Sequence, residues 1–266
     1  MPDTKQLRNR IKSVDSTLHL THAMELVASS KIRKATKRML GSGEYADSMK
    51  RAIEVLSACP SCARSPYMTE RSGGRTCLVV IAGDRGLAGG YNANVFRLAR
   101  KYPDAEVIPV GKRACDRWHK DALRAETFLK EDALRIAKEV CPAFEQGAYD
   151  RFGILYTKYV SMMQQDAIIR WVLPIAKPQE AQASDLVFEP DESAILKAVV
   201  PEYVASAIIA CVRESFASEV AARRTAMDSA GKNARQMIDN LQLEYNRARQ
   251  GAITQEITEI VAGSGS

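Results

Sequence analysis

A glycine-rich segment is the part of the sequence that comes nearest to a binding motif. Gly83, Gly86, Gly89 and Gly90 follow an apolar run and precede Asn92. Such a turn between a strand and a helix can bind phosphate through the free N–H groups of the helix N-terminus. The first glycine spacing is one residue too long for the dinucleotide fingerprint, and no Lys-Ser or Lys-Thr pair follows as in a P-loop. We predict a structural tight turn, with a nucleotide-binding enzyme as the alternative.

Histidines and cysteines offer little for a metal or a nucleophile. His19 and His22 are three residues apart, but no acidic or thiol group nearby completes a convincing ligand set. Cys59 and Cys62 lack the second pair that a zinc site needs, and they lie in a Pro- and Ser-rich segment instead of opening a helix after a strand. We predict no catalytic residue, no metal and no cofactor, and thiols that stay reduced in an intracellular protein.

Basic residues suggest an acidic partner. The net charge is +6, and residues 1–40 account for it. The run from Lys31 to Arg38 has no aromatic residue, so stacking on single-stranded bases is poorly supported. Nucleic acid, lipid or protein could supply the acidic surface, and a solvated helix face is the plainer interpretation. Further cations occur in the last part of the chain: Arg223, Arg224, Lys232, Arg235, Arg247 and Arg249.

The C-terminal part of the chain predicts one very long helix. Beyond Pro201 it has no proline, and only Gly231 and Gly251 interrupt it before the tail. Small or apolar residues recur at steps of three and four, with one extra step of four after Leu241, which indicates a coiled-coil seam with a stutter. The predicted seam residues are Met227, Ala230, Ala234, Met237, Leu241, Tyr245, Ala248 and Ala252.

The N-terminal part predicts a second long helix, which ends near Ser57. Its four-three repeat has a polar defect at Thr21 and Glu25. After the glycines at 41 and 43 we expect the pattern to resume through Tyr45, Met49, Ile53 and Leu56. The first ten seam positions are 7, 11, 14, 18, 21, 25, 28, 32, 35 and 39.

Between the two long helices the sequence pattern changes and predicts alternating strands and helices. Residues 58–74 form a loop by composition, and strands are predicted at 76–82, 106–110, 154–160 and 167–173. Helices are predicted near 93–101, 111–118 and 131–146. This order is typical of a Rossmann-like α/β layer with a mostly parallel sheet. No apolar run approaches the roughly 18 residues of a membrane span.

The fold class that follows is α+β: an antiparallel coiled coil of the two terminal helices with an inserted α/β domain. The predicted division is helix 1–57, loop 58–74, α/β domain 75–190 and helix 191–266. The two ends must pair antiparallel if the inserted domain is to close the loop. Unequal helix lengths leave an overhang of roughly 20 Å, and periodicity does not tell which end protrudes.

Four segments resemble a known family, the γ subunit of bacterial F-type ATP synthases. They are Met24-Glu-Leu-Val-Ala-Ser-Ser-Lys-Ile-Arg-Lys34, the turn Asp84–Asn92, Ala217–Asp228 and Glu244–Gly263. The likeness is weak over residues 97–150. In this family the γ subunit is a central shaft without catalytic activity of its own. It couples rotation of the ion-driven c-ring to ATP synthesis or hydrolysis at the β subunits. A basic coiled-coil protein that binds nucleic acid is the alternative.

The resemblance also implies partners and contact residues. The partners are the α and β subunits, ε and the membrane c-ring, with no nucleic acid and only indirect contact with the membrane. The location that the resemblance implies is the cytoplasmic side of the bacterial cell membrane, where the chain is a peripheral subunit. The C-terminus is the protruding end. Residues matched to rotor–stator contacts are Met24, Arg223, Gln250, Thr254 and Glu256; the apolar bearing tip is Ile257, Ile260 and Val261; the foot is Tyr45, Leu186, Phe188 and Glu189.

This sequence departs from the family at a few positions. Leu186 stands where tyrosine is frequent in the foot, so an aromatic contact is missing there. Gly83 and Ala88 stand where serine and cysteine are common in the turn. The redox insert of chloroplast relatives is absent, and Cys59 and Cys62 lie in a different region.

Overall fold

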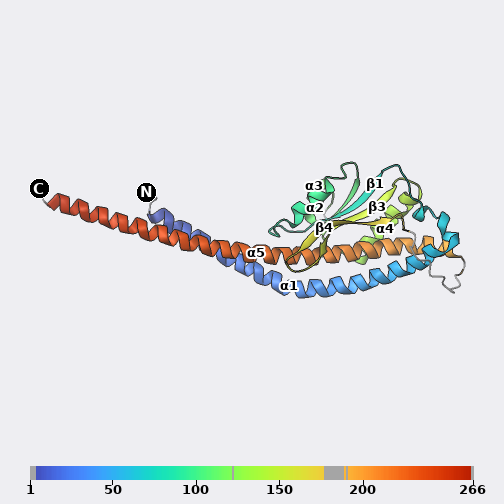
Figure 1. Cartoon of the computed structure of the whole chain (residues 1–266), viewed down its shortest axis with the longest axis horizontal. Coiled ribbons are helices and arrows are strands. Elements are labelled where there is room, and N and C mark those ends of the chain that lie inside the picture. The colour runs from blue at the N-terminus through green and yellow to red at the C-terminus, as the bar shows by residue number, and fades with distance from the viewer. Residues whose placement is uncertain (1–3, 122, 177–188, 190, 265–266) are drawn as a thin grey trace. The chain divides into compact units, whose positions relative to one another are not determined.

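The computed structural model describes residues 4–121, 123–176, 189 and 191–264. The elements in chain order are α1 (Thr4–Ala58), the 3-10 helices η1 (Pro60–Arg64) and η2 (Pro66–Met68), β1 (Thr76–Ile81), α2 (Tyr91–Ala99), β2 (Glu106–Val110), α3 (Lys112–Trp118), α4 (Lys130–Glu145), β3 (Arg151–Tyr159), β4 (Gln165–Leu173) and α5 (Glu192–Ser264) (Figure 1).

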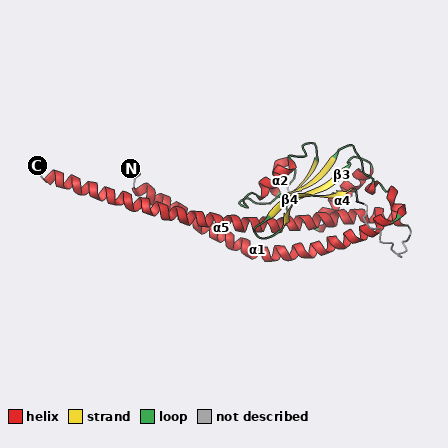
Figure 2. Ribbon diagram, viewed as in Figure 1, coloured by secondary structure: helices red, strands yellow, loops and turns green. Residues whose placement is uncertain are grey.

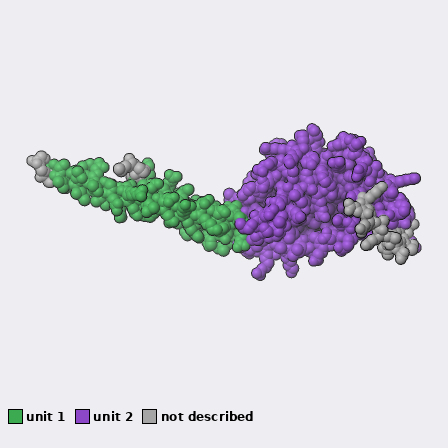
Figure 3. Space-filling view, in the orientation of Figure 1, with its two compact units in different colours: residues 1–28, 224–266 green, residues 29–223 purple. Residues whose placement is uncertain are grey.

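Two compact units divide the chain within its two long helices and not at their ends (Figure 3). Unit 1 holds residues 1–28 and 224–266, and unit 2 holds residues 29–223. Each long helix therefore contributes to both units. The four-part division by elements that the sequence suggested stays a prediction.

Unit 2 is built on a four-stranded sheet in the order β2-β1-β3-β4 (Figure 2). β1 pairs in parallel with β2 and with β3, and β3 pairs antiparallel with β4. Parallel neighbours need a crossover connection, which helices supply here, whereas only residues 160–164 separate β3 from β4. The predicted mostly parallel sheet is confirmed.

Helices cover both faces of this sheet. On one face Val79 and Ile154 belong to a core shared with α1, α4 and α5. On the other face Val80 packs with Val95 of α2 and Ala114 of α3. Successive residues of a strand point to opposite faces. Both faces of β1 are therefore buried, which is why its sequence is a continuous apolar run.

The part of α5 in unit 2 contacts other elements on more than one side. The Ser218 hydroxyl donates to the Thr157 carbonyl oxygen of β3 at 3.0 Å, and Arg213 donates to Ser42 Oγ of α1 at 2.6 Å. An 18-residue window of α5 is long and apolar enough to cross a membrane, where we expected no such segment, but 61% of it is buried inside the protein. A helix that is apolar on most sides is typical of a core position.

In unit 1, α1 and α5 lie side by side and antiparallel (Figure 1). A Cβ atom placed on Gly231 would lie 3.6 Å from Thr21 Oγ1 and 3.8 Å from Leu18 Cδ1. Glu25 lines the same small cavity as Met227. Residue numbers therefore increase along α1 in the direction in which they decrease along α5. The predicted antiparallel coiled coil of the chain ends is confirmed.

The seam of α1 follows the predicted repeat and extends it. All ten predicted positions from Leu7 to Met39 are buried or half-buried. Beyond them the repeat continues without a break through Ser42 and Ala46, both buried. The expectation that Tyr45 belongs to the seam is wrong, because its side chain is 42% exposed.

The seam of α5 differs from the predicted one at three positions, of which the last, Ala252, is exposed. Met237 is 45% exposed, whereas Ile238 is half-buried and Leu241 is 5% exposed. Gly231 contacts α1 at a position that the prediction gave to Ala230. The observed seam is a strict four-three repeat, and the predicted stutter is wrong. Its residues are Met227, Gly231, Ala234, Ile238, Leu241, Tyr245 and Ala248.

The C-terminal end of α5 extends past the start of α1 (Figure 1). Counting from Gly231 opposite Leu18 and Thr21 places Thr4 level with the segment 245–248 of α5. About 16 residues, or roughly 25 Å of helix, then remain up to Ser264. All residues from Ala252 to Gly263 are exposed. The resemblance had predicted that this end protrudes.

Candidate functional site

The glycine-rich turn is held by hydrogen bonds inside unit 2. The Asp84 carboxylate accepts from the backbone N–H groups of Lys112 (2.9 Å), Ala125 (3.1 Å) and Glu126 (2.8 Å). The Gly83 N–H donates to Asn92 Oδ1 at 2.9 Å. An aspartate that accepts three backbone donors fixes two loops against the turn. These contacts agree with the predicted structural role.

Arg223 fastens the same turn to α5. Its Nε and Nη2 atoms donate to the Gly86 carbonyl oxygen at 3.2 and 3.1 Å, and Nη2 also pairs with the carboxylate of Glu219. The side chains are 13% and 3% exposed, respectively. A buried ion pair is stable only when further hydrogen bonds satisfy its groups, as they do here. We name Glu219, Arg223 and the turn 83–86 the α5 clamp.

A side chain at position 83 would crowd the carboxylate of this clamp. A Cβ atom there would lie 2.9 Å from the Glu219 carboxyl carbon, which is closer than van der Waals contact permits. Burial raises the pKa of Glu219, and the positive charge of Arg223 opposes that shift. A serine at position 83 would therefore displace the Glu219 carboxylate in this chain.

Next to the clamp lies a buried polar cluster that the sequence did not reveal. The Tyr91 hydroxyl lies 2.7 Å from Ser215 Oγ, which also accepts from the Thr157 N–H at 3.3 Å. Burial raises the pKa of Tyr91. The available signal was a group of polar residues at 214, 215, 218 and 219 inside an apolar helix, together with the four-residue spacing of Glu219 and Arg223.

The basic run of α1 is only partly neutralised within unit 2. Lys31 Nζ contacts Glu126 Oε1 at 2.6 Å, and this hydrogen bond lowers the pKa of Glu126. Arg33 and Lys37 have no ion pair with any described residue. Both line a groove of about 640 Å³ between α1 and the β3–β4 turn, whose floor includes Leu40 and Tyr159. An acidic, partly apolar surface would fit its chemistry.

The residues predicted to contact the stator lie at separate levels. Met24 is half-buried in unit 1, next in sequence to Glu25, which lines a small cavity together with Met227 of α5. Gln250, Thr254 and Glu256 are exposed about 35 Å further along α5. Thr254 donates to the Gln250 carbonyl oxygen within the helix at 2.9 Å. Arg223 belongs to unit 2 and to the clamp, a contact that the sequence did not predict.

The predicted bearing tip presents apolar side chains to solvent. Ile257 is 56% exposed, and Ile260 and Val261 are each 64% exposed. Ile253, four residues before Ile257, is also exposed. Several large apolar groups on a helix end are unusual for a monomeric surface and are typical of a partner contact.

The predicted foot is described only in part. Tyr45 is exposed, with Lys130 Nζ at 5.9 Å from its ring centroid. Glu189 is exposed. Leu186 and Phe188 lie outside the described residues. Their role and that of the two described residues stay predictions.

Neither histidine pair nor cysteine pair forms a metal cluster in the described residues, where no group of three or more potential ligands occurs. His19 contacts Asp15 at 3.7 Å and His22 contacts Glu25 at 3.6 Å, each within one helix. All six cysteines are free thiols, and all but Cys59 are buried. Burial raises the pKa of the Cys62 thiol.

Known proteins that resemble this chain identify its family. A family model described as ATP synthase matches residues 3–266. A relative from Acetobacterium woodii, the "ATP synthase gamma chain, sodium ion specific", is 38% identical over 299 residues and covers 98% of each chain. This chain belongs to the ATP synthase gamma chain family. The gamma chain of Moorella thermoacetica is 35% identical and covers 99% of each chain.

Solved structures share the fold of this gamma-chain family member. One chain in the Euglena gracilis mitochondrial ATP synthase, in an assembly of OSCP, F1 and c-ring, has a TM-score of 0.68 and 18% identity, with 97% and 92% of the two chains covered. A chain in the central stalk and c-ring of Tetrahymena thermophila has a TM-score of 0.61 and 21% identity, with 79% and 99% covered. The predicted family and fold class are confirmed.

Proposed function

We propose that this chain is the rotating central subunit of an F-type ATP synthase. It couples ion-driven rotation of a membrane ring to ATP synthesis or hydrolysis at partner catalytic subunits and does no bond chemistry itself. The observation that carries the proposal is the paired helix ends of unit 1, which bury one continuous seam and leave a single-helix extension with exposed isoleucines. The family identity agrees with this role.

A shaft must resist bending and unwinding under load, and two features of this chain serve that need. The strict four-three seam gives the pair a regular knobs-into-holes contact along the described part of α1. The α5 clamp fastens the helix to the glycine-rich turn of unit 2 at Gly86. Force applied to the turn therefore reaches α5 through the two hydrogen bonds that Arg223 donates, alongside the apolar core that α5 shares with the sheet.

The partners we propose are the α and β subunits, ε and the membrane c-ring. Similar solved structures come from an F1 and c-ring assembly, a rotor and a central stalk, which supports partners of this kind. Met24, Arg223, Gln250, Thr254 and Glu256 then contact the stator. The tip residues Ile257, Ile260 and Val261 turn in an apolar sleeve, and Tyr45, Leu186, Phe188 and Glu189 form the foot.

The exposed cations of α1 give this proposal a chemical basis. Arg33 and Lys37 are free of ion pairs in the described chain and flank an apolar groove. Acidic loops of the β subunits would neutralise them at a modest cost in desolvation. The location we propose for this chain is the cytoplasmic side of the bacterial cell membrane. It is attached there through the c-ring and does not insert into the membrane itself.

Co-expression with the α and β subunits of the same organism tests the proposal. We expect one complex that contains all three chains and hydrolyses ATP, while α and β without this chain give a less active mixture. A chain that purifies apart from both subunits would contradict the proposed function. The comparisons give no support to the nucleic-acid-binding alternative, which predicts DNA affinity that falls linearly with salt on a log–log scale.

A further inference from the structure

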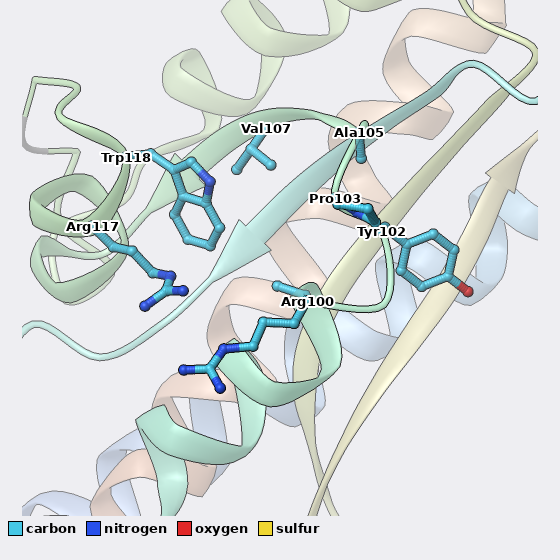
Figure 4. Close-up of a pocket in the computed structure, with 8 residues that line it drawn as sticks. Arg100, Tyr102, Pro103, Ala105, Val107, Arg117 and Trp118 are labelled. Carbon is cyan, nitrogen blue, oxygen red and sulfur yellow. The ribbon is translucent and has the colours of Figure 1, made fainter.

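A pocket with no assigned role lies on the outer layer of unit 2. Its volume is about 220 Å³, and its wall comes from the ends of α2 and α3 and from β2. Arg100 follows α2, Arg117 and Trp118 end α3, and Val107 belongs to β2 (Figure 4).

Two arginines give the pocket an uncompensated positive charge. Neither Arg100 nor Arg117 has an ion pair among the described residues, and both are exposed. Figure 4 shows their guanidinium groups extending to the same side of the pocket. Guanidinium groups that share one opening provide paired N–H donors for a phosphate or carboxylate.

Aromatic rings hold one of these arginines in place. The Arg117 guanidinium carbon lies 5.0 Å from the Phe96 ring centroid and 5.6 Å from that of Trp118. A guanidinium held over aromatic rings by a cation–π contact keeps N–H groups available to a ligand. Phe96 meets Trp118 edge to face at 5.9 Å, so the indole is also fixed in orientation. The group is organised in advance for an anion.

The rest of the wall suits a flat apolar group. Trp118 is half-buried and lines the pocket together with Val107, Ala99 and Ala105. Such a surface accepts a planar ring by stacking, which is worth about 1–3 kcal/mol for a nucleic-acid base on an aromatic side chain. A simple anion would leave this part of the pocket unused.

We propose that this pocket binds a small phosphate-bearing molecule with a planar ring, the chemistry of a nucleotide. The ring lies against Trp118, and the phosphate groups accept from Arg100 and Arg117. The volume is below the 300–1,000 Å³ usual for ligand sites, so the site encloses the ring and leaves the phosphates at the rim. The site is separate from the glycine-rich turn and does not depend on the proposed rotary function.

Tryptophan fluorescence tests the site directly. The chain has two tryptophans, so Trp171→Phe leaves Trp118 as the only reporter in the full-length protein. Titration with ATP is expected to quench it with saturation at or below millimolar concentration, whereas tripolyphosphate and adenosine bind at least tenfold more weakly. Arg100→Gln and Arg117→Gln should each weaken ATP binding about tenfold, the effect of losing one charge-assisted hydrogen bond.

Arg97→Gln is the matched control, because Arg97 is an exposed arginine of α2 that does not line the pocket. It should leave the ATP affinity unchanged. Absence of saturable quenching, equal affinity for tripolyphosphate and ATP, or an equal loss in Arg97→Gln would each overturn the proposal. Thermal melting of all variants shows whether a substitution disturbs the fold. Calorimetric titration of Trp118→Leu with ATP measures binding without the fluorescent reporter, which separates ligand binding from a structural role of the rings. Assembly with α and β is measured independently, so a failure here does not touch the rotary function.

Discussion

At the scale of single residues, the α5 clamp concentrates several constraints. Glu219 is buried with one cation beside it, and Gly83 leaves just enough space for its carboxylate. Arg223 pairs with the Glu219 carboxylate and also donates to the Gly86 carbonyl oxygen. Removing one member of such a group costs more than the pair contributes, because a buried group is left without its partner.

We expect Arg223→Gln to destabilise unit 2 by about 3 kcal/mol at pH 8. The loss should be smaller at pH 5. The pKa of Glu219 is already raised by burial, and Arg223 is the group that lowers it, so the variant raises it further. A raised folded-state pKa gives stability that is present at low pH and is lost as the pH rises through that value. Urea unfolding followed by tryptophan fluorescence measures this, because Trp118 and Trp171 both lie in unit 2.

Glu219→Gln is the control for this prediction. It removes the titrating group, so the free energy of unfolding should depend less on pH between 5 and 8 than in the unmodified chain. The double variant Glu219→Gln with Arg223→Gln should recover part of the loss. An Arg223→Gln protein that loses the same stability at both pH values would show that the carboxylate is not the cause.

At the scale of elements, the register between α1 and α5 explains how unit 1 is held. The seam meets a polar layer at Thr21 and Glu25, which the helices satisfy locally. Thr21 Oγ1 donates to the Leu18 carbonyl oxygen at 2.8 Å, and Glu25 contacts His22. Gly231 faces this layer and leaves room for it. Polar residues in a seam lower stability but favour one register over others.

Leu241→Ala and Met237→Ala distinguish the observed seam from one with a stutter. Leu241 is buried, so truncation should cost about 2–4 kcal/mol, and amide hydrogen exchange in residues 230–250 should become roughly 30–1,000-fold faster. Met237 is exposed, so its truncation should change the local stability by less than about 0.5 kcal/mol. Similar losses in both variants would support the stutter and contradict the strict repeat. Mass spectrometry of hydrogen exchange in the full-length chain reports the exchange rates of unit 1 separately from those of unit 2.

At the scale of the whole molecule, the proposed function uses the C-terminal end of α5. Residues 252–263 of α5 are exposed, and isoleucines at 253, 257 and 260 face solvent. Burying each such side chain in a partner would contribute about 1.5–3 kcal/mol. The extension therefore has the chemistry of a contact made only in the assembled complex.

Deletion of Gln255–Ser266 should leave both units folded and weaken coupling in the complex. Seam residues up to Ala248 remain, so hydrogen exchange in residues 227–248 should stay within about threefold of the full chain. ATP-driven ion pumping in membrane vesicles should fall relative to ATP hydrolysis. The control Glu259→Gln removes a charge from the tip without shortening it and should pump normally. Unchanged pumping after the deletion would argue against a bearing role.

The sequence by itself determined the family, the element order and the pairing of the chain ends. Heptad periodicity is a local property of each helix, and the buried strand β1 is a continuous apolar run, so both are visible without coordinates. The four resembling segments include the turn and both helices, which is why the predicted partners follow from them. The strand boundaries differ by no more than three residues from the predicted ones.

Only the tertiary structure decided which side of each helix faces its partner and which polar groups are buried. Met237 and Ile238 are neighbours in sequence and both apolar, and the rotation of α5 against α1 alone selects Ile238. The same rotation selects Ala46 over Tyr45. The α5 clamp joins positions more than 130 residues apart in the sequence, and no local pattern encodes the approach of a distant carbonyl oxygen to an arginine. Periodicity fixes that a face is buried, whereas packing fixes what it is buried against.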